Sequence, residues 1–515
     1  MDKKRSVLNV GVSIISKFIL LFVALIVRRL LIQRIGNDVN GLNSLYTDII
    51  GMLSVAELGV GSAIVYSMYS PIVAGNVKAV SALYGLYRKL YRIIGAVILI
   101  AGFAVSPFLP KLIGDFDSIG SGVNVYLTYC LTVIAVFISY IYSAKSSLIE
   151  AHKNNYITTV ITTVSKLVMY ALQIGAILIW KSFTAFAVCK IIGSLVSWVL
   201  TEVIVRRKYG DIIRLKEPLD REEEAGIVRN IKAMFMHKIG TILVSGVDSV
   251  IISAFIGVVI LGKYNNYVYI AEVVSSVLAL FFSPVTSVVG HLCAEKDPVK
   301  TKHYFNYFYS MNLALGLVFF LGYYAVIDGL VAVCFGEGLE ITRIIVFVLT
   351  LNQFTRFMRS APLLFRNASG TFYNDRWKPL AEGTANLLLS LLLVIVLPDE
   401  LKIAGVIGAT VITTLGICHI VEPFVIFRHV FEISPKKFYL KNYLYIALFS
   451  ACLLGMTYLS GLFGFDGKGI TGILINGAVS LGISAAALGL AALFDRELRD
   501  SVKAASNYIK SRIKA

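Results

Sequence analysis

The chain has 515 residues, of which 57% are hydrophobic and only 15% are charged. Soluble domains carry about 25% charged residues, so this composition excludes a soluble globular protein and predicts a membrane protein. The formal net charge of +17 indicates anionic surroundings, and the positions of the basic residues show which kind.

Apolar stretches long enough to cross the hydrocarbon core of a bilayer, which takes about 20 helical residues, recur along the whole chain. They predict fourteen transmembrane helices, although the arginine-rich region at 340–380 leaves the number open by one or two. No signal-peptide cleavage site follows MDKKRSVLNV, so we expect the first helix to be retained. The predicted spans are roughly 8–33, 42–68, 90–112, 123–145, 155–180, 182–206, 231–254, 262–289, 304–333, 341–364, 377–398, 403–427, 440–463 and 470–494.

Lysine and arginine residues lie mostly on one side of these spans. An even number of spans puts both termini on the same side, and the segments on that side hold 35 of the 48 basic residues, against seven on the other. Cytoplasmic segments carry the excess of basic residues, which predicts a multi-pass protein of the cytoplasmic (inner) membrane with both termini in the cytoplasm. The positive charge then faces anionic lipid, and we expect no nucleic-acid partner.

Nothing in the sequence suggests a catalytic centre. Outer loops of about ten residues leave no room for a catalytic domain, and GFDGKG at 464–469 lacks the spacing of a phosphate-binding loop. The six cysteines form no CxxC pair, and no two histidines have metal-ligand spacing. We therefore expect a protein that is not an enzyme and has no cofactor, and its coupling to a proton gradient, a sodium gradient or the membrane potential is left open.

The longest connection, 206–230, divides the first six spans from the next six. Sliding the sequence by 221 residues aligns 7–95 with 228–316 without a gap. Six spans per half predict a parallel repeat, in which substrate sites lie between the halves. The aligned pairs include Asn9 with Asn230, Lys17 with Lys238, Gly36 with Gly257 and Gly41 with Gly262. The predicted segments are an N-lobe at 1–206, a cytoplasmic linker at 207–230, a C-lobe at 231–427, a helix pair at 440–494 and an amphipathic cytoplasmic tail at 495–515.

Six basic residues belong to neither side of the membrane, because they fall inside predicted spans. Each costs roughly 2.5–3.5 kcal/mol near a helix centre and so needs a partner, water or a function. Lys17 and Arg28 are eleven residues apart, which places them on one helix face about 16 Å apart. Alternatively, Arg29 reaches the outer head groups, and Lys17 is interfacial if the first helix begins later than Leu8. The six are Lys17, Arg28, Arg29, Lys166, Lys190 and Lys238.

Four acidic residues also fall inside predicted spans. Asp48 and Asp248 lie near the depth of the paired arginines, which predicts either a salt-bridged outer gate or static neutralisation. The other two, nearer mid-depth, are candidates for groups that couple transport to protons. They are Glu57 and Glu272. Three further acids near cytoplasmic helix ends, Glu202, Glu382 and Glu422, are expected at the membrane interface.

Several strings resemble one known family. They are RRLLIQRIGNDVNGL at 28–42, VAELGVGSAIVYSMYSP at 55–71, VDSVIISAFIG at 247–257 and GKYNNY at 262–267. With the plan of six, six and two helices, they are similar to the polysaccharide (Wzx-like) flippases of the multidrug/oligosaccharidyl-lipid/polysaccharide exporter superfamily, the O-antigen and capsule-repeat translocases. The resemblance covers nearly the whole chain through loose motifs.

The resemblance implies an all-α, MATE-like polytopic membrane protein with about 14 helices, built from two parallel-repeat six-helix lobes and a C-terminal helix pair. It implies a flippase that moves a polyprenyl-diphosphate-linked oligosaccharide from the inner to the outer leaflet by alternating access through a basic central cavity. The implied partners are that lipid, membrane lipids and polysaccharide polymerase machinery. The candidate substrate-binding residues are Arg28, Arg29, Lys17 and Lys238, and the candidate gate or coupling residues are Asp48, Asp248, Glu57 and Glu272.

A positively charged, hydrated cavity lowers the barrier for an anionic head group, and the fork-shaped donors of Arg28 and Arg29 suit diphosphate oxygens. Two alternatives remain. A drug/cation antiporter of the same superfamily would share the fold, but a basic first helix has the wrong sign for cations. A membrane polysaccharide polymerase or ligase usually carries a large outer loop with catalytic residues, which this chain lacks.

Overall fold

The computed structural model describes residues 2–54, 60–120, 122–215, 217–219, 246–282, 289–290, 292–293, 295, 297–463 and 469–500. Every regular element in these ranges is a helix, so the predicted all-α class is confirmed. Ten helical segments among them are long and apolar enough to cross a membrane. The count of fourteen stays a prediction, since the predicted span 231–254 lies largely outside the described residues.

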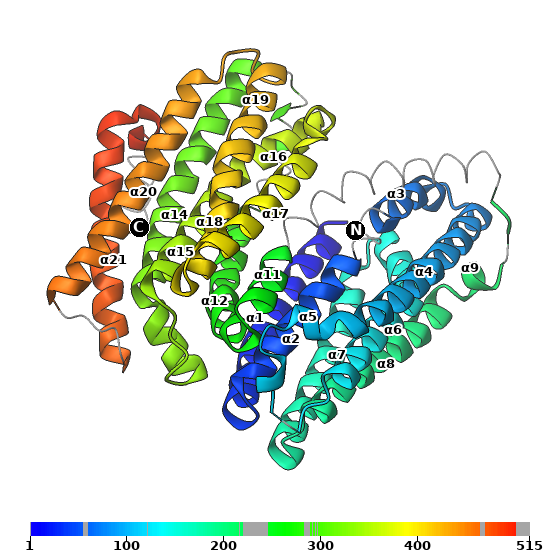
Figure 1. Ribbon diagram of the computed structural model, residues 1–515. Coiled ribbons are helices and arrows are strands. Elements are labelled where there is room, and N and C mark those ends of the chain that lie inside the picture. The colour runs from blue at the N-terminus through cyan, green and yellow to red at the C-terminus, as the bar shows by residue number, and fades with distance from the viewer. Residues whose placement is uncertain are drawn as a thin grey trace, which may run out of the picture. The chain divides into compact units, whose positions relative to one another are not determined.

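The helices follow one another along the chain as coloured in Figure 1. Up to residue 262 they are α1 (Asp2–Arg34), α2 (Asn37–Leu53), α3 (Val60–Val73), α4 (Val77–Val105), α5 (Leu109–Leu112), α6 (Val125–Ala151), α7 (Asn155–Gly175), α8 (Phe183–Lys208), α9 (Gly210–Arg214), α11 (Val247–Phe255) and the start of α12 (Val258–Phe282). After it they are the rest of α12, α14 (Pro298–Phe335), α15 (Arg343–Met358), α16 (Ser360–Ser369), α17 (Lys378–Val396), α18 (Lys402–Thr413), α19 (His419–His429), α20 (Lys436–Phe463) and α21 (Gly469–Phe494). Short π-helical turns, η4 (Ala176–Trp180) and η7 (Thr414–Cys418), follow α7 and α18.

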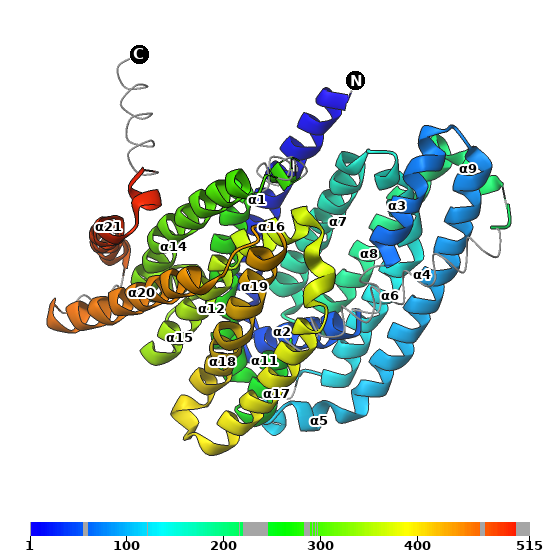
Figure 2. The same cartoon turned by 90° about the horizontal axis from the view of Figure 1, so that it is seen from above.

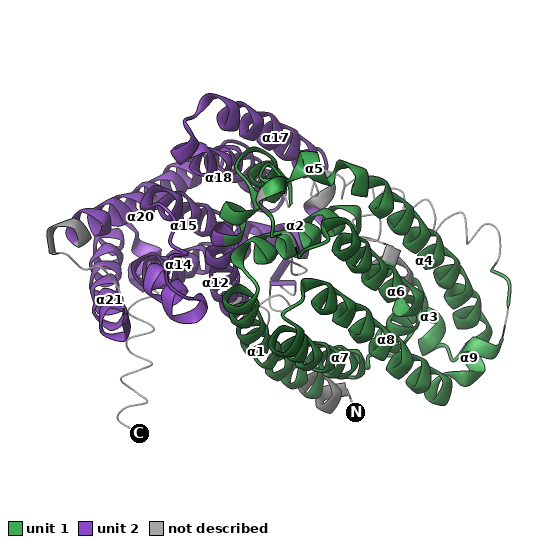
Figure 3. Ribbon diagram, turned by 60° about the horizontal axis from the view of Figure 1, so that its bottom comes forward, with its two compact units in different colours: residues 1–262 green, residues 263–515 purple. Residues whose placement is uncertain are grey.

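The chain packs as two compact units, residues 1–262 and 263–515 (Figure 3). The division falls later than the predicted start of the C-lobe at 231, because α11 packs against α2 and α5 in the first unit. The predicted boundaries of the lobes and the linker therefore stay predictions. Of the amphipathic tail, residues 501–515 lie outside the described part of the chain.

In unit 1, α6 packs against both α4 and α8, and α7 packs between α8 and α1 (Figures 1 and 2). Tyrosines fill much of its core: Tyr87 and Tyr91 of α4 meet Tyr140 of α6, and all three are buried. Such side chains bury a large ring and keep a polar hydroxyl group that needs a partner. This bundle forms the support on which α1 and α2 lie.

In unit 2, α14 is the central helix and packs against α15, α20 and α21. Its Phe305 lies among rings from other helices, including Phe365 of α16 and Phe427 of α19. The helix pair predicted to be appended to the repeat, α20 and α21, is therefore packed into this unit through α14.

Two helices begin earlier than the predicted spans. α4 begins at Val77 instead of near 90, and α14 begins at Pro298 instead of near 304. A hydropathy pattern stops at the first charges, whereas a helix continues to a residue that can cap it. The side chain of Asn76 accepts a hydrogen bond from the backbone N–H of Ala79 at 3.1 Å, and Asp297 caps α14 in the same way.

The turn between α1 and α2 and the turn between α11 and α12 have the same backbone geometry. Gly36 and Gly257 both have positive φ angles, of 153° and 117°. The N–H groups of Ile35 and Gly36 donate to the Leu31 carbonyl oxygen, and those of Ile256 and Gly257 donate to the Ile252 carbonyl oxygen. Each residue of the second turn is 221 positions after its counterpart, which is the predicted offset of the repeat. The wider repeat stays a prediction.

Candidate functional site

The basic residues of the predicted site lie on α1. This helix begins at Asp2, so the late start that would leave Lys17 at the interface does not occur. Because α1 is continuous to Arg34, Lys17 and Arg28 share one face of it. Lys17 and Arg29 are exposed, whereas Arg28 is half-buried and its Nη2 atom is fully buried. Lys238 lies outside the described residues.

Two of the four acidic residues come close together in unit 1. Asp48 lies on α2 and Asp248 lies in the first turn of α11, and both are half-buried. A Cβ atom added to Gly246 would lie 3.5 Å from the backbone oxygen of Asp48, so α11 begins directly beside that residue. Asp248 is only two residues further along. Glu272 is exposed on the part of α12 that belongs to unit 2, and Glu57 lies outside the described residues.

α2 is held firmly against the bundle of unit 1 by Tyr46. The side chain is fully buried, and its hydroxyl group donates to the backbone oxygen of Val125 at 2.9 Å. Its ring stacks on Phe183 of α8 and meets the edge of Tyr129 of α6. Asp48, two residues further along, is therefore presented by a helix whose position the bundle fixes.

The first residues of α2 and α12 approach very closely. A Cβ atom at Gly41 would lie 2.0 Å from the Val258 carbonyl oxygen, and one at Gly262 would lie 2.5 Å from the Asn37 carbonyl oxygen. Both contacts relate the same two positions of the repeat, offset by 221 residues. Contacts that exchange equivalent residues in this way are those of a local two-fold relation. Only glycine leaves room for the two backbones here.

Asp115 adds a further contact at this crossing. Its carboxylate oxygens accept hydrogen bonds from the N–H groups of Val258 at 2.7 Å and Val259 at 3.4 Å, at the N-terminus of α12. A carboxylate in that position satisfies backbone donors and favours the helix dipole. The amide of Asn37 donates to the Val259 carbonyl oxygen at 2.8 Å. Asp115 was not singled out from the sequence, where it is one acid in a short outer connection.

A cluster of four buried charges in unit 2 corrects one expectation. Glu382 and Glu422 were expected at the membrane interface, but they are only 5% and 0% exposed. Arg359 donates to both oxygens of Glu422, at 2.7 and 3.2 Å, and lies 3.5 Å from Glu382. Lys378, also buried, donates to Glu422. The pattern of a single helix does not show these partners, because they come from different helices.

This cluster is electrically balanced. Two carboxylates face one guanidinium and one ammonium group, and the pair between Arg359 and Glu422 is bidentate. The residues come from the α15–α16 junction, α17 and α19. The cluster therefore joins these helices, and its charges are already compensated.

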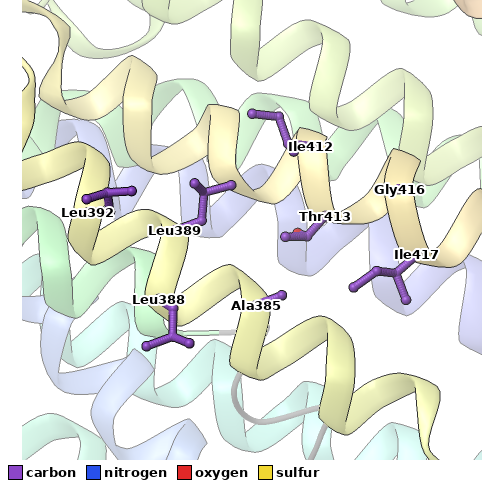
Figure 4. A pocket seen from close by; sticks show the side chains of 8 residues that line it. All are labelled: Ala385, Leu388, Leu389, Leu392, Ile412, Thr413, Gly416 and Ile417. Atoms are coloured by element: carbon purple, nitrogen blue, oxygen red, sulfur yellow. The ribbon is translucent and has the colours of Figure 1, made fainter.

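An apolar groove lies between α17 and the consecutive elements α18 and η7 (Figure 4). Its volume is about 480 Å³, and Leu389, Leu392 and Ile412 are among the side chains that line it. The only polar side chain in the lining is Thr413, whose hydroxyl group donates to the Ala409 carbonyl oxygen in its own helix. A groove of this kind suits a hydrocarbon chain and offers nothing to a polar head group.

Comparisons with known proteins agree on the class of protein. A family model described as "Polysaccharide biosynthesis protein" matches residues 6–288, more than half of the chain. No curated protein sequence matches it. A structure described as "Lipid II flippase MurJ, inward closed conformation" aligns with a TM-score of 0.63 at 14% identity, over 94% of this chain and 99% of that one. An inward-facing multidrug resistance MATE family transporter of the MOP superfamily aligns with a TM-score of 0.59 at 13% identity, over 80% and 96%. At these identities the two structures show that the fold is shared.

Proposed function

Because the chain belongs to the polysaccharide biosynthesis protein family, we propose that it is a flippase. Its substrate is a polyprenyl-diphosphate-linked oligosaccharide, the repeat unit of a polysaccharide, which it moves from the inner to the outer leaflet of the cytoplasmic membrane by alternating access. The observation that carries this proposal is the basic face of α1, an otherwise apolar helix, in a member of this family. The fold shared with a protein named as a lipid II flippase supports it.

The physical problem for such a substrate is its head group. Sugar hydroxyl groups and an anionic diphosphate lose their hydration in hydrocarbon, and a buried charge without partners is very costly. Guanidinium groups at Arg28 and Arg29 would replace that hydration with paired, charge-assisted hydrogen bonds. Lys17, on the same face of α1 as Arg28, provides a second positive position about 16 Å along the helix. The polyprenyl tail needs no such help and stays in lipid.

Asp48 and Asp248 are proposed to act as the counter-charges of these arginines. Both acids are brought together where α11 begins beside α2, and α2 also packs against α1. In the absence of substrate they would neutralise the arginines and close an outer gate, and the diphosphate would compete with them for the same donors. Glu57, Glu272 and Lys238 keep the coupling and binding roles predicted for them, as proposals. Polysaccharide polymerase machinery is the proposed partner on the outer side.

The fold shared with a multidrug transporter keeps a drug/cation antiporter as the second candidate. The charge of α1 distinguishes the two, because a basic face attracts anions and repels organic cations. A membrane polymerase or ligase has no comparable support from the described residues.

Binding to the purified full chain would separate these candidates. A short-chain polyprenyl-diphosphate oligosaccharide and the cation tetraphenylphosphonium would be titrated in parallel, at low and high salt. We expect the oligosaccharide lipid to bind more weakly as salt rises, and the cation not to bind. Binding of the cation with no binding of the oligosaccharide lipid would refute the proposal in favour of the antiporter.

A further inference from the structure

A polar pocket lies inside unit 1, between α2, α6, α7 and α8. Its volume is about 400 Å³, within the range of roughly 300–1,000 Å³ that is usual for small-molecule sites. Every residue that lines it belongs to unit 1. Its polar lining consists of Thr47, Ser54, Thr132, Ser139, Lys190 and Ser194. The function proposed above uses none of these residues.

Lys190 supplies the only charge in this lining. Its ammonium group donates to the amide oxygen of Asn43 at 2.6 Å and to the hydroxyl oxygen of Thr132 at 3.5 Å, and it lies 5.8 Å from the centre of the Phe186 ring. No acidic side chain in the described part of the chain forms an ion pair with it. An ammonium group has three donors, so one remains for a ligand.

The position of Lys190 makes this charge unusual. It lies seven residues inside α8, an apolar helix long enough to span the membrane. The clustered cations of unit 2, Arg359 and Lys378, are paired with carboxylates, whereas the neighbours of Lys190 are neutral. A lysine at membrane depth costs roughly 2.5–3.5 kcal/mol on the insertion scale. A ligand that brings one negative charge would offset that cost.

The hydroxyl groups of the pocket define the rest of the ligand. Thr47, Thr132 and Ser139 donate their protons to carbonyl oxygens one turn earlier in their own helices, at 2.8, 2.9 and 2.6 Å. Their oxygen atoms keep lone pairs that can accept hydrogen bonds from a ligand. The pocket therefore offers one cationic donor together with several neutral acceptors. That set matches a molecule with one anionic group and several hydroxyl groups.

We infer that this pocket binds a hydroxylated monoanion, and that its natural ligand is an acidic sugar residue of the transported head group. The carboxylate of the sugar contacts Lys190, and its ring hydroxyl groups donate to the serine and threonine oxygens. A diphosphate carries more than one negative charge and is better matched by the two guanidinium groups of α1. The preference for a hydroxylated anion depends on the pocket alone, whereas its assignment to the transported sugar rests on the proposed function.

Direct binding of free sugars tests the pocket without reference to transport. Saturation-transfer NMR on the purified full chain would compare D-glucuronate with D-glucose, for the wild type and for Lys190→Met. We expect glucuronate to bind, glucose to bind at least ten-fold more weakly, and Lys190→Met to lose most of the glucuronate signal. The matched control is Lys166→Met, which removes an exposed lysine from the neighbouring helix α7 and should leave the signal unchanged.

Two further variants keep the test decisive if Lys190→Met does not fold. Lys190→Arg keeps the charge and should keep glucuronate binding, whereas Ser139→Ala removes one acceptor and should weaken it a few-fold. Equal binding of glucose and glucuronate by the wild type, or unchanged glucuronate binding in a folded Lys190→Met protein, would overturn the inference.

Transport then separates the inference from the function on which its sugar assignment rests. Proteoliposomes would be supplied with two polyprenyl-diphosphate disaccharides that differ only by glucuronic acid in place of glucose. Faster flipping of the acidic substrate by the wild type, with the difference lost in Lys190→Met, is expected. Equal flipping of both substrates would refute the sugar assignment and leave the flippase intact. Flipping of neither, with glucuronate still bound, would refute both the function and the sugar assignment and keep the anion pocket.

Discussion

Basic residues within the apolar part of this chain differ in what surrounds them. Arg359 and Lys378 are buried against two carboxylates, whereas Lys190 is surrounded by neutral groups and Lys17 and Arg29 are exposed on α1. A balanced cluster serves to hold helices together, and an unbalanced or exposed charge in an apolar helix is available to a ligand. The distinction assigns a structural role to unit 2's cluster and binding roles to the others.

The buried cluster gives the first prediction, which concerns stability. Replacing Glu422 with Gln leaves Arg359 and Lys378 buried without a full counter-charge, and breaking a buried ion pair in this way costs about 3–5 kcal/mol. The unfolding temperature of the Glu422→Gln protein in detergent should therefore fall clearly below that of the wild type.

Asp399→Asn is the matched control for that change. Asp399 pairs with Lys402 at 2.5 Å, but its side chain is 90% exposed, and an exposed pair contributes about 0–1 kcal/mol. An equal loss of stability in the two variants would contradict the structural role of the cluster.

At this scale the sequence predicts charges well and partners poorly. The unusual positions of Lys17, Arg28 and Lys190 are visible because each interrupts an apolar run. The burial of Glu382 and Glu422 is not visible, because the residues that compensate them lie on other helices. The helix pattern alone therefore placed these two acids at the interface.

Between elements, the crossing of α2 and α12 makes the tightest demand on residue size. Gly41→Ala would place a Cβ atom 2.0 Å from the Val258 carbonyl oxygen, which is backbone and cannot turn aside. The two helices must separate, so we expect a lower unfolding temperature and slower transport. Thermal unfolding and flipping rates measured on the same preparation would check both effects.

Gly85→Ala in α4 is the control for the crossing. Nothing lies within 4 Å of a Cβ atom at Gly85, and alanine favours a helix interior by about 1 kcal/mol over glycine. This variant should be as stable as the wild type or more so. If Gly41→Ala behaved in the same way, the close approach of α2 and α12 would be disproved.

The end of α21 gives a prediction about pH. Burial opposes ionisation of Asp495, but hydrogen bonds from Lys441 and Tyr445 outweigh it, so the pKa of Asp495 is lowered below its usual 3.8. The ionised carboxylate thus adds stability at pH values above 3.8, and this contribution is lost as the pH falls through the lowered pKa. Asp495→Asn should be less stable than the wild type at neutral pH, and the difference should shrink below about pH 4. A difference that is constant from pH 7 to pH 3 would contradict this assignment.

Elements were easier to predict than the contacts between them. The predicted range 155–180 coincides closely with α7 and its π-helical turn, and the offset of 221 residues leads to the matching turns at Gly36 and Gly257. The sequence did not show that Asp115 caps α12, because the two segments are far apart along the chain. Nor did it show that packing divides the chain after Gly262.

At the scale of the whole molecule, composition and hydropathy were sufficient for the class of fold. An all-helical membrane protein with the fold of flippases and multidrug transporters is confirmed by the described helices and by the shared fold. The direction of transport, the substrate and the roles of the charged residues are properties of two units acting together, and they remain proposals that transport must test.

Head-group flipping in proteoliposomes is the most direct test of the central claim. A short-chain polyprenyl-diphosphate oligosaccharide with a fluorescent head group would be exposed to an impermeant quencher, with proton and sodium gradients and a membrane potential each imposed in turn. We expect the wild type to move the head group under at least one of these conditions. Arg28→Ala/Arg29→Ala should flip about 10- to 100-fold more slowly, because hydrogen bonds to a charged group contribute roughly 1.5–3 kcal/mol. Lys166→Ala should match the wild type. A wild-type protein that is folded and moves no more substrate than protein-free liposomes under every condition would contradict the account.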